Sequence, residues 1–137
     1  MRKILVALDG LESNSKALEK SIELQNLYEA ELLLYMNLNE SGTNFLKNFK
    51  AEDMEETSEN HSHWHDEMCS LFPYPDKVRT IVDTGEIGPR IVAYAELEEV
   101  DLIVLGSRGL NGLQSLLLGS ISKYVAVHAP CSVYIVK

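Results

Sequence analysis

Apolar and polar residues follow one another in blocks along this chain, and the blocks predict alternating strands and helices. Short apolar runs predict strands at residues 4–8, 32–36, 102–105 and 132–136. Residues 78–82 alternate only weakly, so we expect a further strand there, at or near an edge of its sheet. Helical stretches are predicted between the strands, at residues 14–28, 52–71, 90–99 and 121–127.

Solid apolar strands that alternate with helices predict the fold class. They are typical of a parallel sheet that is covered on both faces, because only such strands are buried on both sides. We therefore expect an α/β fold with an open, mostly parallel five-stranded sheet and helices on both faces. Ser13 is the expected N-cap of the first helix. That helix should bury one broad apolar face, made of Ala17, Leu18, Ile22, Leu24 and Tyr28.

Length and composition bound the class of protein. The 137 residues match one domain, and no repeat or linker divides them, so residues 1–137 are expected to form a single domain. No apolar run reaches about 18 residues and the charged start leads directly into a strand, so neither a membrane span nor a signal peptide is expected. Cys69 and Cys131 are expected to be reduced thiols in a cytoplasmic protein.

The formal net charge of −9 argues against a nucleic-acid partner, because phosphate backbones require a basic surface. It also means that any phosphate site must be built locally, from backbone amides and a few cations. Glycines supply such a site: Gly106-Ser-Arg-Gly109 is followed by nine residues and then by Gly119-Ser120, which opens the last helix. Glycines let a ligand approach the backbone, and a helix start offers unpaired N–H groups and partial positive charge, which together favour phosphate.

This Gly-x2-Gly-x9-Gly-Ser pattern resembles the universal stress protein family, specifically its ATP-binding branch. The opening residues 2–10, residues 101–106 and the closing residues 129–136 also look like family segments, so the likeness covers the chain except for about residues 40–76. The resemblance implies a Rossmann-like fold similar to adenine nucleotide alpha hydrolases. It further implies a stress-response regulatory protein that binds ATP, with Mg²⁺ or Mn²⁺ held by the phosphates.

Candidate site residues follow the predicted strand ends. Ligands of open parallel sheets bind beyond the carboxyl ends of the strands, where Asp9, Asn37 and Gly106 could converge. The resemblance implies that adenine and ribose are lined by Ala7, Leu8 and Asp9, and that the backbone of Asn37 meets the adenine edge. It implies two groups of phosphate ligands: Gly106, Arg108 and Gly109 on one side, and Gly119, Ser120, Ile121 and Ser122 at the helix start.

Simpler interpretations stay open for single residues. Asp9 before Gly10 can be a turn residue, and Arg108 can be a solvated surface charge. His61, His63 and His65 suggest a metal only if the segment is a strand, because residues i and i+2 lie about 200° apart on a helix. The segment is expected to be helix or loop, so we predict a solvated face and no metal site.

Three hypotheses for function remain, from different classes. The P-loop pattern G-x4-G-K-[S/T] is absent, and the glycine motif contains no His or Glu that could act as a base. The first hypothesis is therefore a nucleotide-binding regulatory protein rather than an efficient enzyme. The alternatives are a slow ATPase or adenylating enzyme, and a stress-response interaction module that binds no nucleotide.

The last predicted strand indicates a partner. Residues 132–136 are apolar, and an edge strand of this character invites pairing with another chain. Antiparallel pairing of two copies is the simplest closed solution, and the resemblance implies the same homodimer. A strand that is internal to the sheet is the alternative.

Overall fold

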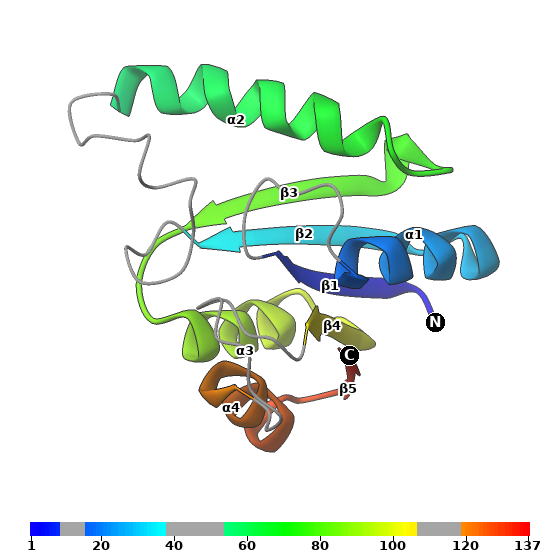
Figure 1. Ribbon diagram of the computed structural model, residues 1–137, viewed down its shortest axis with the longest axis vertical. Coiled ribbons are helices and arrows are strands. Elements are labelled where there is room, and N and C mark those ends of the chain that lie inside the picture. Colours follow the sequence, from blue (N-terminus) through cyan, green and yellow to red (C-terminus); the bar gives the residue numbers. More distant parts are fainter. Residues whose placement is uncertain (9–15, 38–53, 107–118) are drawn as a thin grey trace.

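The computed structural model describes residues 1–8, 16–37, 54–106 and 119–137, and only the backbone of residues 54–61 (Figure 1). The strands are β1 (Lys3–Leu8), β2 (Glu31–Asn37), β3 (Val78–Asp83), β4 (Leu102–Gly106) and β5 (Ser132–Val136). Every neighbouring pair is parallel, in the order β3-β2-β1-β4-β5. The predicted α/β fold with a parallel five-stranded sheet is confirmed, and so are the edge positions of β3 and β5.

Helices cover both faces of this sheet. They are α1 (Lys16–Tyr28), α2 (Met54–Cys69), α3 (Ile87–Leu97) and α4 (Ser120–His128), with a short 3₁₀ turn at Pro75–Lys77. The α1 and α2 side chains contribute to one core cluster and those of α3 and α4 to the other, and Figure 1 shows α3 and α4 side by side. Within the described part of the chain, no helix is long and apolar enough to cross a membrane.

The burial of β1 explains why its sequence is a solid apolar run. Ile4, Val6 and Leu8 enter the cluster on the α1 and α2 side, and Leu5 and Ala7 enter the cluster on the other side. Successive side chains of a strand point to opposite faces, so a strand covered on both faces has no position for a polar residue.

The predicted apolar face of α1 is partly wrong. Tyr28 is 47% exposed, whereas the polar residues Ser21 and Gln25 are fully buried. Gln25 can be buried because its amide is satisfied: Nε2 donates to the carbonyl oxygens of Tyr74 and Ala30, and Oε1 accepts from the Tyr74 N–H. Gln25 thus joins the end of α1 to the segment before β3. The expected N-cap, Ser13, lies outside the described residues.

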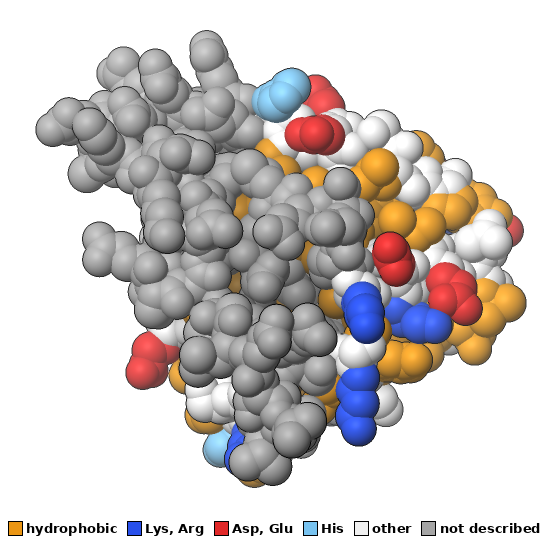
Figure 2. Space-filling model, viewed as in Figure 1, with side chains coloured by type: hydrophobic (Ala, Val, Ile, Leu, Met, Phe, Trp, Pro, Cys, Tyr) orange, Lys and Arg blue, Asp and Glu red, His pale blue; other side chains and the backbone are white. Residues whose placement is uncertain are grey.

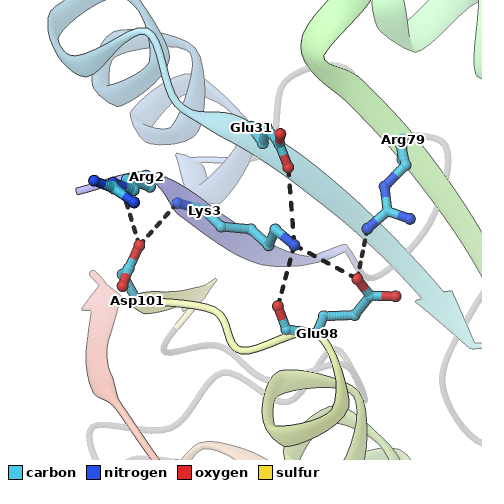
Figure 3. A network of polar contacts seen from close by, with 6 residues as sticks. All are labelled: Arg2, Lys3, Glu31, Arg79, Glu98 and Asp101. Carbon is cyan, nitrogen blue, oxygen red and sulfur yellow. Dashed lines mark hydrogen bonds and ion pairs between the residues drawn. The ribbon is translucent and has the colours of Figure 1, made fainter.

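A polar network closes the amino-terminal edge of the sheet (Figure 3). The Asp101 carboxylate accepts the backbone N–H groups of Arg2 and Lys3 at 2.9 and 3.0 Å, which ties the start of β1 to the start of β4. Glu98, just after α3, pairs with Lys3 and with Arg79 of β3. These contacts hold the starts of the strands in place, at the end of the sheet opposite to the predicted site.

Candidate functional site

The candidate site lies at the carboxyl ends of the strands, where the strand order reverses. From β1 the chain adds β2 and β3 on one side and β4 and β5 on the other, so the switch point lies between β1 and β4. In open α/β sheets the crevice beyond this point is the usual ligand site. Eight predicted site residues are described there or on α4: Ala7, Leu8, Asn37, Gly106, Gly119, Ser120, Ile121 and Ser122. Asp9, Arg108 and Gly109 lie outside the described residues.

The end of β4 and the start of α4 are joined directly. The buried Ser122 hydroxyl donates to the carbonyl oxygen of Gly106 at 3.2 Å. Gly119 is the N-cap of α4, with φ −64° and ψ 161°, and the Lys123 N–H donates back to its carbonyl oxygen. A glycine cap has no side chain that could accept hydrogen bonds from the first-turn N–H groups. Gly119 therefore leaves those donors to another acceptor at the start of the helix.

Gly106 leaves room beside this junction. No heavy atom of the described residues lies within 4 Å of the position that a Cβ would take on Gly106. The space and the helix start together form a place that suits an anion, because the positive end of the α4 dipole points toward it. Ser120 is exposed at the same helix start, whereas the Ser122 hydroxyl is used on Gly106.

The end of β2 carries a chain of hydrogen bonds that runs onto β3 and α3. Asn37 is 2% exposed, and its Nδ2 donates to the Tyr35 hydroxyl at 2.9 Å. The Tyr35 hydroxyl donates to Asp83 Oδ2 at 3.0 Å. Arg90 donates two hydrogen bonds to the same carboxylate, from Nε to Oδ2 at 2.8 Å and from Nη2 to Oδ1 at 3.1 Å.

Charge and burial determine the protonation states of Tyr35 and Asp83. Burial raises the pKa of the Tyr35 hydroxyl far above its ordinary value, so the hydroxyl keeps its proton. Burial also acts to raise the pKa of Asp83, but the Arg90 guanidinium, the Thr84 N–H and the Tyr35 hydroxyl outweigh it and lower the pKa overall. Asp83 is therefore an ionised acceptor, and Tyr35 is a donor toward it.

Sequence reasoning missed Tyr35, Asp83 and Arg90. Asp83 pairs in register with Asn37 at the ends of neighbouring strands, and Tyr35 lies two residues before Asn37 on the same face. A signal was present, because a polar residue ends each of these strands as Asp9 follows the first. Reading it requires knowing that β2 and β3 are neighbours.

The histidine segment lies on α2, away from these strand ends. The helix is confirmed, and His63 is exposed while His65 is partly buried. His65 Nδ1 lies 2.9 Å from Thr80 Oγ1, and its Nε2 lies 3.4 Å from Cys69 Sγ. Within the described residues, no three His, Cys, Asp or Glu side chains come together to hold a metal ion. Both cysteines are free.

The surface charge in view is mixed. On the described part of the face in Figure 2, Lys and Arg side chains lie next to Asp and Glu side chains rather than in one continuous basic area. The start of α4 is a local source of positive potential at the candidate site.

Solved structures share this architecture. A universal stress protein in complex with cAMP is 19% identical with a TM-score of 0.69, over 99% of this chain and 97% of that one. The universal stress protein from Archaeoglobus fulgidus in complex with dAMP is 21% identical with a TM-score of 0.64, over 100% and 98% of the two chains. At these identities the likeness establishes the fold.

Sequence comparison establishes the family. The universal stress protein Sll1388 of Synechocystis is 32% identical to this chain, over 98% of this chain and 97% of that protein. The sequence model of the universal stress protein family matches residues 1–137. Since the match covers the whole length, this chain belongs to the universal stress protein family.

Proposed function

We propose that this chain is an adenine nucleotide-binding regulatory protein of the stress response, with ATP as its ligand. The observation that supports this proposal most directly is the junction of β4 and α4 at the switch point. There, Gly119 provides no side-chain cap for the backbone N–H groups at the start of α4. The relatives of the same fold that were solved with cAMP and dAMP support an adenine nucleotide as the ligand. Residues 1–137 would act as one domain in the cytoplasm.

The phosphates would lie over the first turn of α4. The backbone N–H groups there and the exposed Ser120 hydroxyl would donate to them, with Arg108 and Gly109 closing the other side and Mg²⁺ or Mn²⁺ keeping part of its water shell. Residues 7–9 would line the ribose and the base, and Asn37 would meet the base edge. The sequence has no P-loop lysine, which supports binding rather than efficient phosphoryl transfer.

The protein would act as a homodimer through β5. This strand is at the edge of the sheet, and Tyr134 at its centre is 40% exposed. The neighbouring Val133 and Ile135 pack partly against the core beside α3 and α4. An apolar edge strand next to a second copy satisfies the backbone groups of both strands.

Gly119 offers a test that separates phosphate binding from helix stability. In Gly119→Asp the carboxylate can cap α4, because the backbone at this position already has the extended conformation of an N-cap. It also places a negative charge where phosphate would bind. We expect the melting temperature to hold or rise, and the affinity for ATP to fall about 100-fold by like-charge repulsion.

The matched control is Gly119→Asn, which caps the helix without the charge and should lose much less affinity. Titration calorimetry measures binding, and mass spectrometry of nucleotide released from freshly purified protein identifies the natural ligand. Tight ATP binding by Gly119→Asp would place the phosphates elsewhere. A parent protein that neither carries nor binds an adenine nucleotide would overturn the proposed function and favour the interaction module.

A further inference from the structure

The first three residues of α4 differ in how far they are exposed. Ser120 is exposed and Ile121 is partly buried, whereas Ser122 is 0% exposed. The sequence resemblance groups all three as phosphate ligands. A ligand can reach Ser120 and Ile121 from outside, but the Ser122 side chain is enclosed by the protein itself.

The Ser122 hydroxyl has its partner inside the protein. It donates to the carbonyl oxygen of Gly106 at 3.2 Å. A hydroxyl has a single proton, so it cannot donate to a phosphate while this bond is made. The bond joins the last residue of β4 to the first turn of α4.

Gly106 is a residue whose backbone benefits from such a bond. Glycine has more conformational freedom to lose on folding than any other residue, because no Cβ restricts it. Packing does not replace the missing Cβ, since no heavy atom of the described residues lies within 4 Å of the position that it would take. The peptide of Gly106 is therefore held by its pairing with Val136 of β5 and by the Ser122 hydroxyl.

The orientation of the Gly106 carbonyl group matters to an anion nearby. A carbonyl oxygen carries partial negative charge and can only accept, so it would repel the oxygens of a phosphate. The N–H groups at the start of α4 have the opposite charge and attract them. A bond that holds the carbonyl oxygen on Ser122 keeps it from turning toward the phosphate, and a site ordered in advance loses less entropy on binding.

We propose that Ser122 is a positioning residue of the nucleotide site, whose hydroxyl holds the Gly106 carbonyl group so that the phosphates meet the donors of Ser120 and Ile121. The inference rests on the proposed function, because it assigns a role within that site. It gives the two serines of this turn different tasks. The Ser120 hydroxyl donates to phosphate, and the Ser122 hydroxyl acts on phosphate only through Gly106.

The first test compares ATP with adenosine, which has no phosphates, by titration calorimetry on protein freed of nucleotide. Ser122→Ala should lower the affinity for ATP about three- to tenfold, the usual effect of one hydrogen bond, and leave the affinity for adenosine unchanged. Ser122→Thr and Ser122→Val are a matched pair, because they share a shape and differ in the hydroxyl. The Thr variant should bind ATP more tightly than the Val variant by a similar factor, and this pair carries the test if Ser122→Ala does not fold.

A second measurement separates positioning from direct contact with phosphate. The carbonyl ¹³C signal of Gly106 is recorded by NMR in the nucleotide-free protein. Ser122→Ala should shift this signal upfield, because the carbonyl group loses a hydrogen bond. Ser120→Ala is the control: it should weaken ATP binding and leave the Gly106 signal unchanged.

The outcomes separate this inference from the proposed function. Weaker ATP binding by Ser122→Ala, together with a shifted Gly106 signal, supports the positioning role. Unchanged ATP affinity, an equal loss for ATP and adenosine, or an unaltered Gly106 signal overturns that role and leaves the proposed function standing. A parent protein that does not bind ATP overturns the proposed function and this inference with it.

Discussion

At the scale of single residues, Gly88 shows how closely α3 and α4 approach. A Cβ at Gly88 would lie 2.9 Å from Cδ1 and 3.2 Å from Cγ of Tyr124 on α4. Those atoms belong to the root of a ring that stacks on His128 at 4.1 Å between centroids, so the ring has little room to move. A larger residue at position 88 would therefore push the two helices apart.

We expect Gly88→Ala to destabilise the protein by about 1 kcal/mol. Overpacking costs about 1–3 kcal/mol, and the better helix propensity of alanine returns up to about 1 kcal/mol. Urea unfolding measures the change. In a Tyr124→Ala background the clash is gone, so the same substitution should be neutral or stabilising, and additive effects in this double-mutant cycle would refute the close contact.

At the scale of elements, Asp101 joins the starts of β1 and β4 (Figure 3). Hydrogen bonds from the backbone N–H groups of Arg2 and then Lys3 lower the pKa of this carboxyl below its ordinary value of 3.8. A group whose pKa is lowered by folding adds stability above its unfolded pKa and loses it as the pH falls through the folded pKa. The β1–β4 connection should therefore weaken in acid.

Asp101→Asn tests this connection. The variant should be less stable than the parent at pH 7 and should lose less further stability between about pH 5 and pH 2, because it has no charge to neutralise. The measurement is the urea midpoint across this range. Asp76→Asn, at an exposed position in the turn before β3, is the control and should follow the parent. Parallel curves for Asp101→Asn and the parent would mean that the carboxylate charge contributes nothing.

At the scale of the whole molecule, the exposed edge of β5 is where a second copy would bind. Tyr134 is better suited to a test than Val133 or Ile135, because those two side chains also pack against the core of their own chain. We expect Tyr134→Glu to weaken the dimer at least about tenfold, since a dimer would contain the change twice.

Sedimentation velocity over a dilution series measures this effect. Val127→Glu is the matched control, because Val127 is a 77% exposed apolar residue on α4, and it should leave the dimer intact. An undiminished dimer in Tyr134→Glu would exclude β5 as the interface. A parent that is monomeric at every concentration would exclude the homodimer.

The sequence by itself determined the α/β class and the five strands, because buried strands leave solid apolar runs that are read without any knowledge of their neighbours. The sequence also located the glycine motif, because the end of a strand and the start of a helix can both be predicted from local sequence. Only the tertiary structure decided which strands are adjacent. Gln25 and Tyr35 depend on partners about 50 residues away in the sequence, Tyr74 and Asp83, and no local pattern contains these pairs. The burial of apolar residues can be predicted from the sequence pattern, whereas the hydrogen-bond partners of a buried polar group depend on which residues folding brings beside it.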